Sequence, residues 1–412
     1  MIANYILPVL AAVGSVAAQS STCSPSGGTT TINSQADATG LANCKTLKGS
    51  VLIGANAGPV IDISGPSQVT GDITVENNGV ITTLQSTNLG AVGGAFTLRN
   101  LTILTTFQFT SLQSVKTIDW QSLPALGSLT ITAPGVTQAT DVKISDTFLS
   151  TLDGIDLTSV RSMNINNNRR LTKFSTQLGN LSDILNIQAN GRQLEVTMPN
   201  LIWIANMTIA NVTSFSVPSL AVVNGSARFD FNYFTSFSAP NLTSARSGDI
   251  SFVGNANLAN ITMPQLTSIG GGLLIANNTG LGELNGFQKL SEIGGAVKLR
   301  GNFTVVEFPS VDDVKGAFDI SSTANIQDEC DKFKSLAPTN QGGNGMIQGL
   351  YTCTSNNEDA NNDTNSTSTG GGSSSSGGSS SSSGDDKNAA SSLTISNALL
   401  GVAALAGFAS LL

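Results

Sequence analysis

The chain has 412 residues and a formal net charge of −8, from 19 lysines and arginines against 27 aspartates and glutamates. It contains no histidine, which excludes Ser-His-Asp and Cys-His catalytic arrangements and the usual zinc sites. Basic residues are too few for a phosphate-binding surface, so nucleic acid is not an expected partner. A hydrophobic share of 40% excludes disorder of the whole chain.

The N-terminus carries a short apolar run over residues 5–18 that ends on Val16-Ala17-Ala18. This run is shorter than the ~20 residues that span a bilayer, and its small final residues suit a signal peptidase. We therefore expect residues 1–18 to be a signal peptide that is cleaved before Gln19. A buried N-terminal strand is the alternative. Residues 19–43 would then form an N-terminal cap on the folded domain.

Residues 44–325 repeat a pattern in which two alternating apolar residues are followed, three positions later, by asparagine. Ile250, Phe252 and Asn255 form one such set. The leucines that close the repeats recur with a period close to twenty or in the low twenties, at Leu181, Leu201, Leu220, Leu242, Leu266 and Leu290. Such a period is typical of a solenoid with one coil per repeat.

The pattern predicts a mainly β fold, a right-handed parallel β-helix in the form of a leucine-rich solenoid. Alternating residues give a strand with one inward face, and coils stacked about 4.8 Å apart allow each strand to pair with its neighbours. About thirteen coils would give a rod roughly 60 Å long. A division of this rod into two halves is an alternative organisation. Glycine pairs such as Gly271-Gly272 are expected at tight bends between the sides of a coil.

The recurrent asparagines are expected to have a structural role. When they stack at one place in successive coils, their amides can satisfy backbone groups where the strand turns away. Ligand binding is the alternative. The expected ladder consists of Asn78, Asn168, Asn190, Asn255, Asn278 and Asn302.

Four cysteines flank the repeats, Cys23 and Cys44 before them and Cys330 and Cys353 after them. In an oxidising compartment they allow three pairings. Pairing 23 with 44 and 330 with 353 would close a local loop over each end of the stack, where open strand edges invite aggregation. The scattered spacing of the cysteines argues against a zinc site, which is the alternative.

The region after the last coil, residues 326–353, is expected to form a C-terminal cap. Four of its apolar residues have the spacing of one face of a short helix that would cover the end of the stack. These residues are Ile326, Cys330, Phe333 and Leu336.

Residues 354–388 consist largely of Ser, Thr, Gly and Asn, and we expect a flexible stalk that carries O-linked sugar. Small residues, a polar spacer and an uncharged apolar terminus follow, which is the layout of a GPI-attachment signal. Asn388 is the expected attachment residue, with Gly384 as the alternative, and residues 389–412 would be removed. A marginal membrane anchor is the other interpretation of this tail, which reaches only about 22 Å as a helix.

Residues 44–53, Cys-Lys-Thr-Leu-Lys-Gly-Ser-Val-Leu-Ile, resemble the opening of a receptor L-domain, the leucine-rich β-helix of insulin- and EGF-receptor ectodomains. Residues 290–299 are similar to the repeat of that module. Such coils between a signal peptide, a Ser-rich stalk and a GPI signal resemble the fungal GPI-anchored cell-wall organisation proteins. This resemblance covers nearly the whole chain.

The resemblance implies a non-enzymatic surface glycoprotein that is needed for wall integrity and morphogenesis and has no cofactor. It places the protein at the outer leaflet of the plasma membrane, in the cell wall, or in both. The implied partners are the glucan and mannoprotein network of the wall and the membrane, through a GPI lipid. The resemblance names no specific protein ligand.

Secretion would make exposed Asn-x-Ser/Thr sequons acceptors for N-linked glycan. Asn302 also lies in a sequon, but its expected place in the ladder predicts little or no modification. The candidate acceptors are Asn100, Asn180, Asn206, Asn211, Asn224, Asn241, Asn260, Asn277, Asn362 and Asn365.

An adhesin that binds carbohydrate or protein through a flat face of the solenoid is the first alternative function. It would favour exposed aromatic residues, but aromatics make up only 5% of the chain. We expect the one dense cluster to be core with a few surface rings. It consists of Phe229, Phe231, Tyr233, Phe234 and Phe237.

A polysaccharide-active enzyme is the second alternative, since parallel β-helices also carry polysaccharide lyases and glycosidases. Glycoside hydrolysis needs two or three convergent carboxylates. No acidic set recurs at one position of adjacent coils, so these residues are expected to be solvated charge. The sets are Asp312-Asp313, Asp328-Glu329 with Asp331, Asp153 with Asp156, Glu358-Asp359 and Asp385-Asp386.

Overall fold

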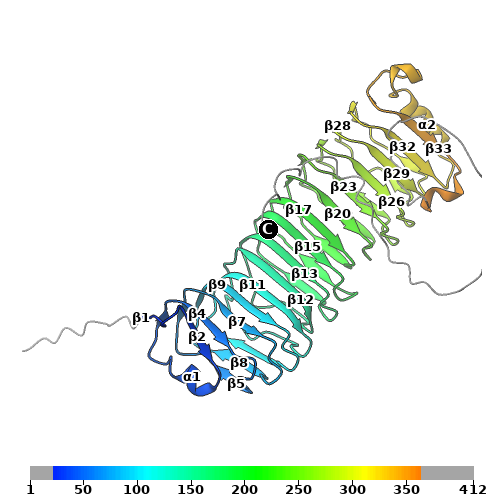
Figure 1. The fold of residues 1–412 in the computed structure, drawn as a ribbon. Helices are drawn as coiled ribbons and strands as arrows, with labels where there is room; N and C mark the ends of the chain where they lie inside the picture. Colours follow the sequence, from blue (N-terminus) through cyan, green and yellow to red (C-terminus); the bar gives the residue numbers. More distant parts are fainter. Residues whose placement is uncertain (1–21, 363–412) are drawn as a thin grey trace, which may run out of the picture. The chain divides into compact units, whose positions relative to one another are not determined.

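The computed structural model describes residues 22–362, which form a parallel β-solenoid of about fourteen turns (Figure 1). The compact unit reaches to Asn361. Within the described residues, no helix is long and apolar enough to cross a membrane. Outside them lie the predicted signal peptide, one sequon, most of the stalk and the GPI signal, at residues 1–18, Asn365, residues 363–387, Asn388 and residues 389–412.

The largest sheet has 23 strands, and every pairing in it is parallel. Its strands are β1 (Thr22–Cys23), β2 (Thr29–Ile32), β3 (Thr46–Leu47), β4 (Ser50–Ile53), β6 (Gln68–Val69), β7 (Ile73–Glu76), β9 (Ala91–Arg99), β11 (Ser114–Leu123), β12 (Asp141–Thr147), β13 (Ser159–Asn166), β15 (Asn180–Gln188), β17 (Trp203–Ala210), β19 (Val222–Val223), β20 (Ala227–Asp230), β22 (Ser244–Ala245), β23 (Ile250–Val253), β25 (Ser268–Ile269), β26 (Leu273–Ala276), β28 (Glu292–Ile293), β29 (Val297–Gly301), β31 (Asp313–Val314), β32 (Phe318–Ser322) and β33 (Tyr351–Thr354).

Short parallel sheets form another side of the turns. Their strands are β5 (Val60–Asp62), β8 (Thr83–Ser86) and β10 (Thr106–Phe109); β14 (Lys173–Ser175), β16 (Glu195–Thr197) and β18 (Ser214–Ser216); β21 (Ser236–Ser238) with β24 (Asn260–Thr262); and β27 (Glu283–Leu284) with β30 (Val305–Val306). The helical segments are α1 (Gln35–Thr39), α2 (Gln327–Lys334), η1 (Thr339–Gln341) and η2 (Glu358–Asn361).

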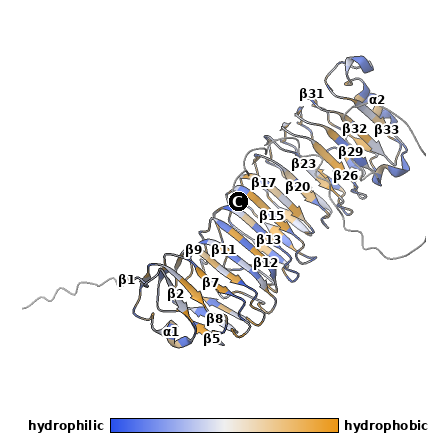
Figure 2. Ribbon diagram, in the orientation of Figure 1, coloured by the Kyte–Doolittle hydropathy of each residue, from blue (hydrophilic) through white to orange (hydrophobic). Residues whose placement is uncertain are grey.

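Equivalent residues of successive turns stack directly on one another. Phe229 of β20 pairs with Phe252 of β23, and their rings lie 4.5 Å apart between centroids in a stacked arrangement. Both side chains are buried, as are the alternate apolar residues of the other strands. Figure 2 shows these apolar positions recurring along the strands of the stack. The alternation read from the sequence thus produces one continuous column of apolar side chains.

Glycines shape the bend that divides the largest sheet into two strands per turn near both ends of the stack. A Cβ atom at Gly295 would lie 2.8 Å from the backbone carbon of Gly271 and 2.8 Å from the backbone nitrogen of Gly272. Successive backbones therefore approach too closely at this bend for any side chain. In central turns that lack such glycines, β11, β13 and β15 continue through the bend as single strands. The register of their pairing with neighbouring strands shifts at that point.

We predict that Gly295→Ala destabilises the solenoid by about 1–3 kcal/mol, because the backbone must shift to accommodate the methyl group. Gly79→Ala is the matched control, since a Cβ at Gly79 would meet no atom within 4 Å. Chemical denaturation of both variants measures the difference. Equal stability of the two would contradict the close approach at the bend.

The ends of the stack are closed as the sequence predicts. Disulfides join Cys23 to Cys44 and Cys330 to Cys353. Helix α2 buries Cys330 and Phe333, and the Phe333 ring lies 4.9 Å from that of Phe318 in the last long strand, β32. The predicted parallel solenoid with disulfide-closed ends is confirmed.

The folded unit extends further than the expected start of the stalk at residue 354. The backbone N–H of Asn357 donates to the carbonyl of Ser322 at 2.8 Å, and Ala360 is fully buried. Residues 354–361 therefore complete the C-terminal cap, because they supply backbone donors and a small apolar side chain to the last turn.

Candidate functional site

A chain of buried asparagine amides connects three successive turns. The Oδ1 of Asn255 accepts hydrogen bonds from the backbone N–H and the Nδ2 of Asn232, at 2.8 and 3.0 Å. The Nδ2 of Asn255 donates to the carbonyl of Phe229 at 2.8 Å. Asn278 makes the same contacts one turn later, with Asn255 and with the carbonyl of Phe252. These amide groups make their hydrogen bonds within the fold, so their role is structural.

A second ladder segment lies in the central turns, where Asn168 bonds to Asn190 at 3.1 Å and to the carbonyl of Ile144 at 3.0 Å. Asn78 is buried alone, and its Nδ2 donates to the carbonyls of Gly54 and Ala57. Buried Val212 stands between the two segments.

Sequence reasoning missed Asn232, although it follows Ala227 and Phe229 at the spacing shared by the other repeats. It also missed the feature that turns the chain at each ladder position. The residue before every buried ladder asparagine has a left-handed backbone conformation, with φ between 53° and 68°. Asparagine and glycine adopt this conformation most readily, so the Asn-Asn pairs of the sequence were its signal. The residues are Asn77, Asn167, Ala189, Phe231, Gly254 and Asn277.

Asn302 departs from the prediction, because it lies outside the buried ladder. Its side chain is only half-buried, and its Nδ2 donates to the carbonyl of Thr279 at 2.9 Å. Its Oδ1 accepts from Thr323 Oγ1 at 2.8 Å and from the amide of Asn361. In its turn the strand β29 is one residue longer than β26, and the buried position passes to Phe303.

The sequons of the described residues differ in exposure. Asn211 and Asn277 are half-buried. Seven others expose their side chains to solvent, as an acceptor of glycan requires: Asn100, Asn180, Asn206, Asn224, Asn241, Asn260 and Asn362.

We predict that glycopeptide mapping finds glycan at Asn206 and Asn241 but little at Asn302. The amide of Asn302 is engaged by Thr279, Thr323 and Asn361, whereas the amide of Asn241 has one surface bond, to the carbonyl of Pro218. Full occupancy at Asn302 would contradict this prediction.

The aromatic cluster divides into core and surface rings. Phe229, Phe234 and Phe237 are buried, while Phe231 and Tyr233 are 51% and 38% exposed. The two surface rings do not form part of a described cavity.

Carboxylates that the fold brings together are bridged by arginine. Arg99 contacts Glu76 at 3.5 Å and also pairs with Asp119. Arg161 lies between Asp141 and Asp183, at 2.5 and 2.7 Å. Sequence reasoning did not identify these sets, because their members stand on different turns.

Strand β20 carries one carboxylate, that of Asp230. Burial raises the pKa of Asp230 above its usual range, although Arg228 lies 3.2 Å away. The described residues hold no group of three side chains suited to a metal ion.

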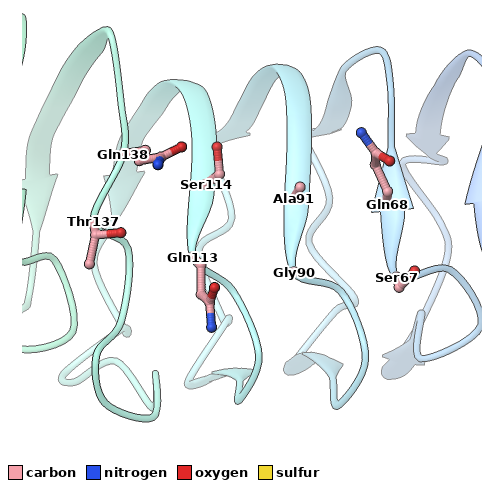
Figure 3. A pocket seen from close by; sticks show the side chains of 8 residues that line it. All are labelled: Ser67, Gln68, Gly90, Ala91, Gln113, Ser114, Thr137 and Gln138. Atoms are coloured by element: carbon pink, nitrogen blue, oxygen red, sulfur yellow. The ribbon is translucent and has the colours of Figure 1, made fainter.

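A shallow groove of about 380 Å³ crosses four successive turns at the start of their strands (Figure 3). Its lining is entirely neutral. Small residues form its centre, and amide and hydroxyl side chains flank them, as Figure 3 shows. The lining residues are Ser67, Gln68, Gly90, Ala91, Gln113, Ser114, Thr137 and Gln138. Sequence reasoning did not predict this neutral polar groove.

Comparisons with known proteins identify the family of the chain. The family description "Ecm33: GPI-anchored cell wall organization protein" matches residues 1–42. The chain is 37% identical to "Protein ecm33" of Aspergillus fumigatus over 85% of each chain. It is 34% identical to a "Cell surface GPI-anchored protein" of Arthroderma benhamiae, over 87% of this chain and 88% of the relative.

A third relative is "Cell wall mannoprotein PST1" of Saccharomyces cerevisiae, 32% identical over 73% of this chain and 67% of its own length. No solved structure matches the chain. The likeness to receptor L-domains therefore stays a prediction. The identities to the first two relatives, which extend over most of both chains, are sufficient to assign the family. This chain belongs to the fungal family of GPI-anchored cell wall organisation proteins.

Proposed function

We propose that this protein is a non-catalytic cell-surface glycoprotein that supports the organisation and integrity of the fungal cell wall. The relatives named above are cell-surface and cell-wall proteins, and they align with this chain over most of its length. The observation that supports the non-catalytic part is that Arg99 and Arg161 pair with the carboxylates that neighbouring turns bring to them. A glycosidase instead needs one carboxylic acid with a raised pKa beside a second, free carboxylate.

Two assays test the two parts of this proposal. Deletion of the gene is expected to make cells hypersensitive to a wall-perturbing dye, and unaltered growth would count against the role in the wall. Purified protein is expected to release no reducing ends from wall glucan. Glucan turnover that is abolished by Asp119→Asn, with the fold intact by circular dichroism, would instead establish an enzyme.

The anchoring at the cell surface is part of the same proposal. The sequence layout fits cleavage after residue 18 and a GPI lipid at Asn388. It also fits a glycosylated stalk that begins after residue 361, where the folded unit ends. Treatment of membranes with a GPI-specific phospholipase is expected to release the wild-type protein. Asn388→Gln combined with a bulky replacement at Gly384 is expected to prevent attachment, and unchanged release of that variant would contradict the assigned site.

A further inference from the structure

The groove across the N-terminal turns presents side chains that the fold does not use. Gln68, Gln113 and Gln138 are exposed, and their side-chain amides make no hydrogen bond with other described residues. Their backbone N–H groups, by contrast, are bonded to the carbonyls of Lys45, Gly90 and Gln113. These backbone hydrogen bonds hold the main chain of the three glutamines in place. The donors and acceptors of their side-chain amides remain available to a ligand.

The lining also repeats along the stack. Ala91 pairs with Gln68 and with Ser114, and Ser114 bridges to Gln138, so the four residues occupy one position in consecutive turns. At about 4.8 Å per turn, this row is about 14 Å long. An extended polysaccharide advances by a similar step per sugar ring, so that each turn can meet one ring.

The centre of the groove is open because two of its residues are small. Gly90 and Ala91 lie between the longer side chains of the neighbouring turns, as Figure 3 shows. None of the lining residues is charged, so the groove offers no partner to an anionic or cationic ligand. Hydroxyl groups of a neutral sugar can both donate to and accept from amide side chains.

The sequons leave this part of the surface uncovered. Residues 180–302 contain eight, at Asn180, Asn206, Asn211, Asn224, Asn241, Asn260, Asn277 and Asn302, whereas residues 22–179 contain only Asn100. Asn100 follows the far end of the nine-residue strand β9, whose first residue is Ala91. An extended strand of that length separates the two by up to about 30 Å. The sequons of the described residues therefore concentrate after residue 179, and the one before it lies at the other end of β9 from the groove.

We infer that this groove binds a linear neutral polysaccharide in an extended conformation, with about one sugar ring per turn. The amides of Gln113 and Gln138 bond to its hydroxyl groups, and the floor at Gly90 and Ala91 admits the ring faces. This inference deepens the proposed function and rests on it, because it identifies wall polysaccharide as the material that the solenoid contacts.

Titration calorimetry of the full-length protein with β-linked glucose oligomers of increasing length tests the inference, with mannose oligomers as a second probe. Affinity is expected to rise with length and to level off near about four sugars, the number of turns in the groove. The double variant Gln113→Ala/Gln138→Ala is expected to bind about tenfold more weakly, through the loss of two hydrogen bonds.

Ala91→Arg, which fills the floor, is expected to abolish binding. Gln108→Ala is the matched control, because Gln108 lies in β10 on a different side of the same turn and is expected to leave binding unchanged. The replaced side chains are partly or fully exposed and make no side-chain hydrogen bonds, so all variants are expected to keep the melting temperature of the wild type.

Failure to bind either kind of oligomer would overturn the inference, as would equal binding by the groove variants and the wild type. Occupation of the groove by a wall protein that sugars do not displace would overturn it as well. A deletion strain separates the two levels of the proposal. If it is hypersensitive to wall stress and the groove variants restore it fully, the inference fails and the proposed function stands. If its wall is unaffected, the proposed function itself fails.

Discussion

Replacing Asn255 with leucine is expected to destabilise the solenoid by about 3–6 kcal/mol, because several buried polar groups lose their partners at once. The variant removes the acceptor of two hydrogen bonds from Asn232 and the donor to the carbonyl of Phe229. Asn255 itself is fully buried, so water cannot replace these partners. Each buried polar group left without a partner costs about 1–3 kcal/mol.

Asn257→Ala is the control for this experiment. Asn257 stands in the same turn, but its amide makes one exposed bond, to the carbonyl of Tyr233 at 3.3 Å. Its replacement is expected to change stability by no more than about 1 kcal/mol. Denaturant titrations of both variants measure the difference. A loss for Asn255→Leu as small as that of the control would show that the ladder does not hold the turns together.

Removal of the C-terminal disulfide by Cys330→Ala/Cys353→Ala is the second large effect. The bond closes a loop with a sequence separation of 23, so its loss is expected to cost about 3 kcal/mol. The damage should be local, because each turn of a solenoid contacts only its neighbours. Phe333 of helix α2 would then be held on Phe318 by packing alone.

Limited proteolysis reads out this second effect. The double variant is expected to be cut first within residues 323–361, while the preceding turns stay resistant. Removal of the other disulfide by Cys23→Ala/Cys44→Ala is the counterpart, and its first cuts are expected near the N-terminus instead. Simultaneous loss of all turns in either variant would contradict end caps that act locally.

The solenoid could be predicted because each turn repeats the same local requirements. Each coil needs inward apolar residues at alternate positions and an amide where the chain bends, so the same short pattern recurs in the sequence once per coil. Phe252 with Asn255 is one example. The cysteines could be paired because each pair flanks one end of the repeats. These features depend only on residues that lie close together in the sequence, within one turn or at one end of the repeats.

Features that depend on two or more turns could not be predicted in the same way. Asn302 matches the pattern by spacing, but the longer strand β29 places Phe303 at the buried position. Arg99 collects carboxylates from the turns before and after its own. The groove exists because Gly90 and Ala91 stand beside longer side chains of neighbouring turns, a relation that only the register of the strands defines.

We propose that this cell-surface solenoid supports the fungal cell wall without using its clustered carboxylates for catalysis. Growth of a deletion strain under wall stress tests it most directly, when the strain carries either the wild-type protein or a variant with the clustered carboxylates changed to amides. That variant is Glu76→Gln/Asp119→Asn/Asp141→Asn/Asp183→Asn, with surface expression verified by antibody. Both proteins are expected to restore growth equally. Restoration by the wild type alone, at equal surface expression, would contradict it.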